Sequence, residues 1–179
     1  MATLLVAGAL AVVSSTAGTG SVGSGSAAKG AAAAATTTPA PTNSSYGIVD
    51  AAGGVMTFGG AAYSGDTIGY PLVKPIVGSA ANSGGGYWLV ASDGGIFAFG
   101  GAQFWGSTGG LSLNKPIVGM ASTPGGAGYW LVASDGGIFA YGDAQFYGST
   151  GSIRLNKPIV GMAATTDGAG YWLVASDGG

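Results

Sequence analysis

The chain has 179 residues and a formal net charge of −2, from seven Asp, no Glu and five Lys or Arg. It lacks the basic cluster of a nucleic-acid-binding protein, and it has no cysteine for disulfides or thiolate chemistry. Because His, Cys and Glu are all missing, the usual general bases and activated nucleophiles are missing too. The composition therefore predicts a protein that is not an enzyme, binds no nucleic acid and carries no cofactor.

Residues 1–17 have the pattern of a secretory signal peptide. Residues 4–13 are a run of ten apolar residues, which suits the apolar region of a signal and is too short to span a membrane. Residues 15–17 offer a small-residue cleavage site, although no Lys or Arg precedes the apolar run. We predict a secreted or cell-surface protein with no membrane span after signal removal.

Residues 18–45 form a low-complexity segment that consists almost entirely of Ala, Gly, Ser, Thr and Pro, with Lys29 as its only charge. This composition has too little apolar bulk to offset the entropy of ordering the chain. We therefore predict a disordered tether between the signal-like segment and the rest of the protein.

A tandem repeat of 42 residues occupies the remaining chain. The string GYWLVASDGG occurs three times, and residues 86–127 match residues 128–169 at 33 of 42 positions. A fainter copy precedes them, with Tyr46 in the place of Tyr87. A period of this length indicates a repeat architecture with atypical terminal copies. The predicted units are 46–85 (degenerate), 86–127, 128–169 and 170–179 (partial).

One repeat predicts four short antiparallel strands. Residues 129–133 and 138–141 are apolar runs joined by Asp135-Gly136, which indicates a hairpin with a type I′ turn. A third strand is predicted at 145–147 and a fourth at 157–164, where Pro158 can lie only at the strand start or at a sheet edge. No segment shows a sustained helical period.

Four strands in about 42 residues are typical of a β-propeller blade. We therefore predict an all-β fold built from propeller-type tandem repeats. Because propellers use roughly four to eight blades, this chain is expected to be an incomplete propeller of about three. Open blade edges of this kind favour homo-oligomerisation.

The repeat strings also resemble those of a known group. WLVASDGGIFAYGDAQFYGSTG at 130–151 and NKPIVGMA at 156–163 are similar to repeats of many secreted actinobacterial proteins. More distantly, they resemble propeller blades of the regulator-of-chromosome-condensation type. The resemblance covers residues 46–179. It implies an extracellular module that stands alone or beside a peptidase, amidase or glycosidase domain, and it brings no catalytic residues with it.

An aspartate recurs once per strong repeat, at Asp93, Asp135 and Asp177, and Ala52 takes its place in the degenerate copy. A ring of carboxylates for calcium is one interpretation, but calcium needs about six oxygen ligands. Asp is also favoured in hairpin turns. We therefore predict turn residues and no metal site.

A tryptophan recurs in the same way, at Trp88, Trp130 and Trp172, with Gly47 in the degenerate copy. A stacking ladder for sugars and a packed core are the two interpretations. We predict core, because large aromatic rings dominate the packing of protein interiors.

Trp105 and Tyr147 share one position, which Ser64 occupies in the first copy. Other differences between the strong copies gather at 110–112 against 152–154 and at 122–125 against 164–167. Both segments are predicted loops, where binding residues often lie. If the protein has a ligand surface, we expect it there, with Trp105 and Tyr147 as aromatic platforms; drift at exposed sites is the alternative.

These features favour a non-enzymatic extracellular repeat module that serves binding or scaffolding at the cell surface. Its partner would be a cell-wall or extracellular polysaccharide, or a protein. Two alternatives remain open. One is the accessory repeat region of a secreted cell-wall-active hydrolase whose catalytic domain lies outside this sequence. The other is a lectin-like carbohydrate-binding propeller.

Overall fold

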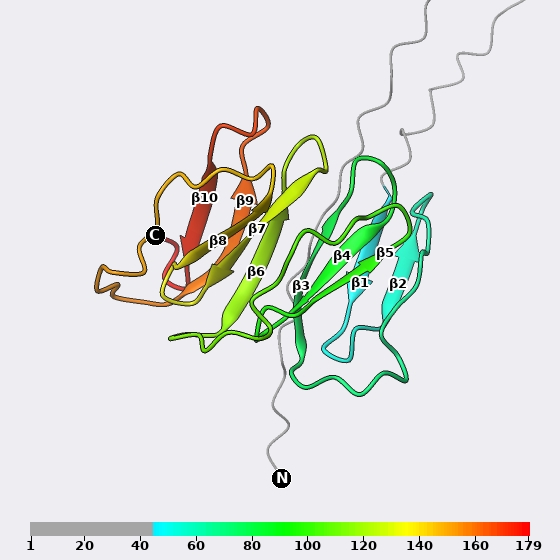
Figure 1. The fold of residues 1–179 in the computed structure, drawn as a ribbon, viewed down its shortest axis with the longest axis horizontal. Coiled ribbons are helices and arrows are strands. Elements are labelled where there is room, and N and C mark those ends of the chain that lie inside the picture. The colour runs from blue at the N-terminus through cyan, green and yellow to red at the C-terminus, as the bar shows by residue number, and fades with distance from the viewer. Residues whose placement is uncertain (1–44) are drawn as a thin grey trace, which may run out of the picture.

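The computed structural model describes residues 45–179, and this part of the chain is all-β. No helix in it has the length and hydropathy to cross a membrane. The signal-like segment 1–17 and the tether predicted at 18–45 lie outside the described residues, apart from Ser45. Ten short strands are present (Figure 1): β1 (Tyr46–Val49), β2 (Val55–Phe58), β3 (Ile76–Ala81), β4 (Tyr87–Ala91), β5 (Ile96–Phe99), β6 (Ile117–Ser122), β7 (Gly128–Ala133), β8 (Ile138–Gly142), β9 (Ile159–Ala164) and β10 (Tyr171–Ala175).

The strands form four small antiparallel sheets that follow one another in chain order. Sheets β3-β4-β5 and β6-β7-β8 have three strands, whereas β1-β2 and β9-β10 have two. Trp88 pairs with Ala80 and Ala98, and Trp130 has the same two partners one repeat later. The all-β repeat fold is thus confirmed. Each three-stranded sheet begins at the Pro-Ile-Val-Gly segment, so it straddles the border between two sequence repeats.

The prediction of four strands per repeat is wrong, because residues 145–147 form no strand. Their backbone groups are instead bound by side chains. The Gln145 carbonyl accepts a hydrogen bond from the Trp130 indole at 2.6 Å, and the Tyr147 amide donates to the Tyr171 hydroxyl at 3.1 Å. This segment is therefore extended and anchored without joining a strand ladder.

The predicted hairpins are present, but their turns are not type I′. Such a turn needs positive φ at both central residues, and among residues 45–179 only glycines have positive φ. In the β7–β8 turn the Gly136 amide donates to the Ala133 carbonyl at 2.8 Å, and the Ala133 amide donates to the Gly137 carbonyl at 2.9 Å. With Gly136 at φ 79°, this is a three-residue loop with a glycine bulge.

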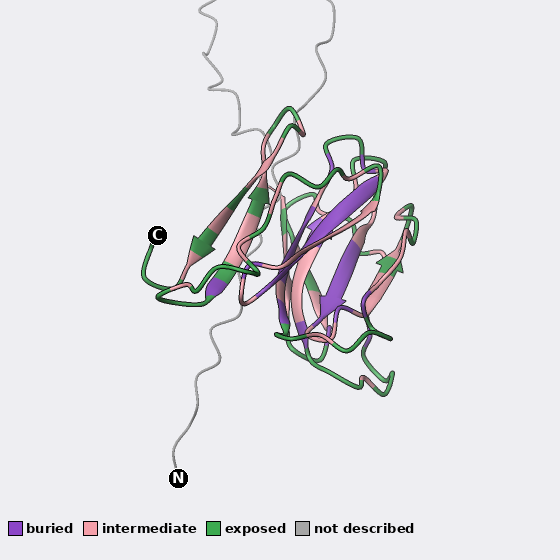
Figure 2. Cartoon of the chain, turned by 60° about the vertical axis from the view of Figure 1, so that its left-hand side comes forward, coloured by how far each residue is buried: buried purple, intermediate pink, exposed green. Residues whose placement is uncertain are grey.

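Consecutive sheets pack face to face, and each middle strand divides its side chains between two neighbours. Trp88 and Val90 of β4 form one core cluster with Tyr129 and Leu131 of β7. Leu89 points the other way, into a second cluster with side chains of β1 and β2. Strands β4 and β7 are therefore buried along nearly their whole length, as Figure 2 shows. Their continuous apolar sequence reflects this two-sided burial.

Strands β3, β6 and β9, which begin the second, third and fourth sheets, approach each other closely because each carries a glycine. A Cβ added at Gly78 would lie 3.3 Å from the Gly119 Cα, and one added at Gly119 would lie 3.9 Å from the Gly161 Cα. Strands β3, β6 and β9 thus lie together, and the other strands extend away from them.

The loop that leaves each sheet returns to its hairpin turn. The buried Thr108 hydroxyl donates to the Asp93 carbonyl at 3.0 Å, and its amide donates to the Gly94 carbonyl at 3.1 Å. Thr67 and Thr150 make the same two contacts in the neighbouring repeats. We call this side of the molecule, where the β1–β2, β4–β5 and β7–β8 turns lie, the Asp-Gly end.

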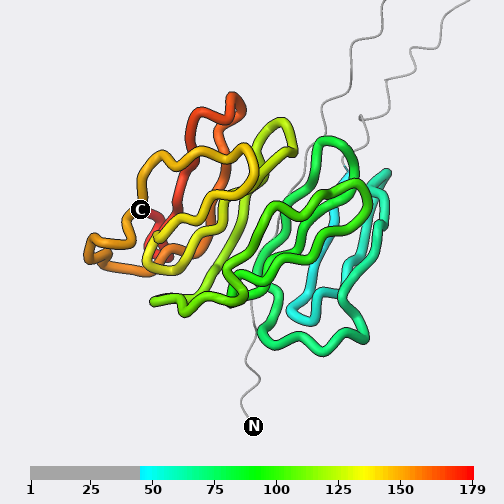
Figure 3. Tube along the Cα trace, viewed as in Figure 1, coloured from blue at the N-terminus to red at the C-terminus, as the bar shows by residue number. Residues whose placement is uncertain are grey.

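The described residues form an open stack with two uncovered outer faces. Figure 3 follows the chain through the sheets from β1-β2 to β9-β10. On the first sheet Tyr46, Met56 and Phe58 are exposed, and on the last sheet Trp172 and Val174 are exposed. Inside the stack, the equivalent faces cover each other.

Candidate functional site

Trp105 and Tyr147, which were predicted to bind a ligand, lie on the segments that follow β5 and β8. Trp105 packs against the core cluster between the second and third sheets, and its buried indole N–H has no hydrogen-bond partner among residues 45–179. The Tyr147 ring centroid lies 6.4 Å from that of Trp130 and 5.9 Å from that of Tyr171. Its hydroxyl donates to the Gly168 carbonyl at 3.0 Å. The Trp105 ring thus fills space between adjacent sheets, whereas the Tyr147 ring contacts both sheets but remains 45% exposed. Ligand binding by both rings stays a prediction.

A tyrosine from the following sheet holds the backbone beside each of these positions. The Tyr129 hydroxyl donates to the Gly106 carbonyl at 2.6 Å and accepts from the Trp105 amide at 3.1 Å. Burial raises the pKa of Tyr129 above its ordinary value, although the same two hydrogen bonds lower it. Two other tyrosines, Tyr87 and Tyr171, make the equivalent pair of contacts. These contacts fix the segment after each sheet against the next sheet.

The residue one position earlier faces solvent. Side chains alternate along an extended backbone, so where Trp105 points inward, its neighbour Phe104 points outward. Phe104 is 56% exposed, Phe146 is 62% exposed, and Tyr63 at the same position of the first repeat is 56% exposed. We call these three residues the aromatic row. The structure thus places one exposed ring per repeat in an equivalent local setting.

Sequence reasoning missed the aromatic row because it treated variation between the repeats as the sign of binding. Phe104 and Phe146 are identical in the two strong copies, within Ala-Gln-Phe, and Tyr63 keeps the aromatic character in the first. An aromatic residue that all three copies keep four residues after a glycine was the signal available. It was passed over in favour of the adjacent position, which varies.

The two variable segments lie at opposite ends of the sheets. Residues 164–167 lead into the β9–β10 turn, where the Gly168 amide donates to the Thr165 carbonyl. Residues 152–154 lie at the Asp-Gly end, because Thr150 is bonded to the β7–β8 turn. Opposite ends of one antiparallel sheet cannot form a continuous surface, so the two segments do not make up a single site.

The variable loop at the Asp-Gly end nevertheless carries a second repeated feature. One position recurs in three equivalent turns and is occupied by Tyr70, Leu111 and Ile153. The amide of each residue donates a hydrogen bond to the carbonyl of the threonine three residues earlier. All three side chains are exposed. We call them the loop row. Its members differ in chemistry, which contrasts with the uniformly aromatic character of the first row.

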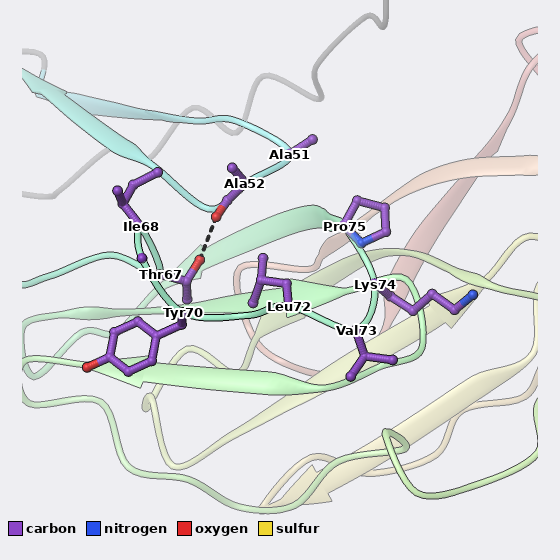
Figure 4. Close-up of a pocket in the computed structure, with 10 residues that line it drawn as sticks. Ala51, Ala52, Thr67, Ile68, Tyr70, Leu72, Val73, Lys74 and Pro75 are labelled. Carbon is purple, nitrogen blue, oxygen red and sulfur yellow. Dashed lines mark hydrogen bonds between the residues drawn. The ribbon is translucent and has the colours of Figure 1, made fainter.

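A shallow cavity of about 340 Å³ lies beside the loop row in the first repeat. Figure 4 shows it between the β1–β2 turn and the following loop, with the Thr67 hydroxyl donating to the Ala52 carbonyl at its base. Tyr70 and Lys74 extend to opposite sides in this view. The lining is mixed and open, and it holds no carboxylate; besides the bonded hydroxyl, its polar side chains are those of Tyr70 and Lys74.

The recurring aspartates are turn residues, as predicted. The carboxylates of Asp93 and Asp135 accept hydrogen bonds from the amides two residues later, at 2.9 and 3.0 Å. Their oxygens thus stabilise the hairpin backbone. Among residues 45–179, no group of three or more His, Cys, Asp or Glu comes together as metal ligands would.

The recurring tryptophans are core residues in the two inner sheets but not in the last. Trp88 is 0% and Trp130 is 1% exposed, whereas Trp172 is 73% exposed. The core prediction is therefore confirmed for two of the three and wrong for the third, on whose face no further sheet packs within the described part of the chain.

Comparison with known proteins adds no identification. A search against protein-family models found no match, and a search of the curated proteins found none either.

Proposed function

We propose that this chain is a non-enzymatic extracellular repeat module that binds a repeating polymer, such as a cell-wall polysaccharide, through the aromatic row. The observation that carries the proposal is the presence of one exposed aromatic ring per repeat, at Tyr63, Phe104 and Phe146. An exposed ring offers a flat apolar face for stacking against a sugar ring or an apolar side chain.

Repetition is what favours a polymer over a small ligand. Equivalent sites on one scaffold engage a repeating partner together, and the effective concentration of the second contact raises the overall affinity. The scaffold holds each ring in place, because the adjoining backbone is bonded to the next sheet through Tyr129 and Tyr171. The aromatic row therefore has both the spacing by repeats and the rigidity that such binding needs.

The two rows supply a matched experiment. Binding of the chain to a panel of insoluble wall polysaccharides is measured by co-sedimentation. The triple variant Tyr63→Ser, Phe104→Ser and Phe146→Ser is expected to lose at least about tenfold in affinity, because aromatic contacts dominate such surfaces. The control triple variant Tyr70→Ser, Leu111→Ser and Ile153→Ser removes equally exposed apolar groups and should bind as the wild type does. Equal losses in both variants would contradict the proposal.

We also propose that the chain self-associates through its outer faces. Tyr46 and Phe58 stack at 4.9 Å on the first sheet, and the exposed Trp172 face of the last sheet matches the face that Trp130 presents inside the stack. Joining these faces between chains would reproduce an internal contact, in the head-to-tail manner that forms rings or filaments. Light scattering is expected to show a dimer or larger species, and Trp172→Ser should shift it to monomer. A wild-type monomer would overturn this proposal.

A further inference from the structure

The contact between the first and second sheets lacks three large side chains that the next contact has. Gly47 stands in the place of Trp88, Ser64 in the place of Trp105, and Ser79 in the place of Met120. The third contact repeats the large set with Trp130, Tyr147 and Met162. The strand pairing is nevertheless unchanged, because Gly47 pairs with Thr57 as Trp88 pairs with Ala98. The first contact therefore has the same strand pairing but smaller side chains between its two sheets.

A cavity of about 300 Å³ lies between β1-β2 and β3-β4-β5, where Gly47 and Ser79 stand in place of the larger Trp88 and Met120. Its lining includes Gly47, Val55, Ser79 and Tyr87. A Cβ added at Gly47 would meet only the Met56 carbonyl, at 3.8 Å, so nothing blocks the space above this glycine. An apolar cavity of about 150 Å³ is enough for a benzene ring, and this one is larger.

The two filled contacts show which group fits such a space. The Trp88 ring lies 5.3 Å from the Tyr129 ring at 59°, and its N–H donates to the Gln103 carbonyl at 2.8 Å. The Trp130 ring lies 5.7 Å from the Tyr171 ring, also at 59°. Each indole is thus fixed by two features, a tyrosine ring on the next sheet and a backbone carbonyl on the segment after its own sheet.

Both features are present around the empty cavity. Tyr87 is the equivalent of Tyr129, and its hydroxyl is held in the same way, by the Ser64 amide and the Gly65 carbonyl. The equivalent of the Gln103 carbonyl is that of Ala62, which also lines the cavity and accepts no hydrogen bond from residues 45–179. The first contact thus keeps the tyrosine ring and the carbonyl acceptor, and it lacks only the indole side chain.

We propose that this cavity binds an aromatic ring that bears a hydrogen-bond donor, of the indole class. The ring stacks against Tyr87 in the tilted geometry of the two internal pairs and donates its N–H to the Ala62 carbonyl. Residues 1–44 contain no aromatic side chain, so that segment holds no ring to fill the site. This site is separate from the aromatic row and does not depend on polymer binding.

The test is titration of the full chain with indole by calorimetry, with amide chemical shifts to locate the site. Saturable binding is expected, with shifts at Gly47, Ser79 and Tyr87. N-methylindole, which lacks the donor, should bind about fivefold more weakly, because a net hydrogen bond contributes about that factor. Gly47→Trp fills the cavity covalently and should weaken indole binding at least about tenfold. Ile48→Trp adds the same ring to the opposite face of β1 and should change the affinity by less than about twofold.

A second variant covers the case in which Gly47→Trp fails to fold. Ser79→Met restores the side chain that Met120 supplies in the next contact, and it too should weaken indole binding severalfold. Absence of saturable binding up to the solubility limit of indole would overturn the proposal. So would indole affinity that neither Gly47→Trp nor Ser79→Met reduces, and equal affinity for N-methylindole would contradict the assigned orientation.

Discussion

Strands β7 and β10 share the sequence Tyr-Trp-Leu-Val-Ala, yet their tryptophans lie in opposite environments. Trp130 is 1% exposed between two sheets, whereas Trp172 is 73% exposed on the outer face of the last sheet. Pairing with the preceding strand is the same in both, since Trp130 pairs with Ala121 and Trp172 with Ala163. Local sequence thus determines the strand, and the next repeat determines whether its apolar face is buried. In repeat proteins stability is of this nearest-neighbour kind.

The largest expected difference between inner and outer sheets is in the tryptophans themselves. Trp88→Ala removes a fully buried ring that contacts Tyr129, and it should lower the free energy of unfolding by about 4 kcal/mol. Trp172→Ala removes a ring that is 73% exposed in the single chain, and at protein concentrations where the chain is monomeric it should cost less than about 1 kcal/mol. Urea denaturation followed by far-UV circular dichroism measures both losses.

The paired variants make this comparison directly, because the two side chains are chemically identical. A loss of similar size at Trp88 and Trp172 would mean that the outer face is covered in solution. The two variants should then be examined again at low protein concentration, where self-association through that face would weaken.

Substitution of a hairpin glycine should destabilise the protein more in an inner turn than in an outer turn. This difference should be smaller than that between the two tryptophans. A Cβ at Gly94 would lie 1.6 Å from the Thr108 hydroxyl oxygen, with φ at 79°. Gly94→Ala is therefore expected to cost about 3 kcal/mol, from backbone strain and displacement of a buried threonine. Gly178 has φ at 87° with nothing within 4 Å of an added Cβ, so Gly178→Ala should cost only the strain of about 1 kcal/mol.

Thermal unfolding distinguishes these two turn variants. Thr108→Ser serves as the control for Gly94→Ala, since it keeps the hydroxyl that donates to the Asp93 carbonyl and changes little else. Equal losses in Gly94→Ala and Gly178→Ala would show that positive φ alone matters and that the threonine contact contributes nothing.

The sequence predicted those parts of the fold that depend on neighbours within one repeat. Apolar runs and Asp-Gly pairs predicted strands β7 and β8 and the place of Asp135 in the turn between them, because these features depend on local pairing and backbone conformation. The prediction of a strand at 145–147 was wrong, because the backbone there is hydrogen-bonded to the side chains of Trp130 and Tyr171. Tyr171 lies 24 residues from its partner Tyr147. Such side-chain contacts with the backbone do not show in the local pattern of apolar and polar residues from which strands are predicted.

The candidate sites were harder to predict for the same reason. That Trp105 points inward and Phe104 outward depends on how their segment is anchored to the next sheet. The replacement of Trp88 by Gly47 was visible in the sequence. Its consequence was not, because the cavity also needs Ser79 of β3, which comes to lie opposite Gly47 only when the two sheets pack face to face.

The smallest expected effect concerns the ionisation of Tyr129, the buried partner of Trp88. Burial raises its pKa above 10.0 in the folded state, and burial also raises the pKa of Tyr141 beside it. An unfolded tyrosine loses its proton at about pH 10. Between that pH and the higher folded-state pKa, the unfolded chain binds fewer protons than the folded chain, so stability falls as pH rises. Below about pH 10 both states are protonated and this contribution to stability is fully present.

Tyr129→Phe should show separately what the Tyr129 hydroxyl contributes to stability through its hydrogen bonds and through its ionisation. At neutral pH the variant is expected to be about 1 kcal/mol less stable, because the Gly106 carbonyl and the Trp105 amide lose their shared partner. Above about pH 10 its stability should decline less steeply than that of the wild type, with the remaining slope coming in part from Tyr141. Denaturation midpoints measured across this range test both points. An unchanged alkaline slope in Tyr129→Phe would show that the tyrosine between the inner sheets is reached by water, and the contrast between inner and outer sheets would then be one of packing and not of solvation.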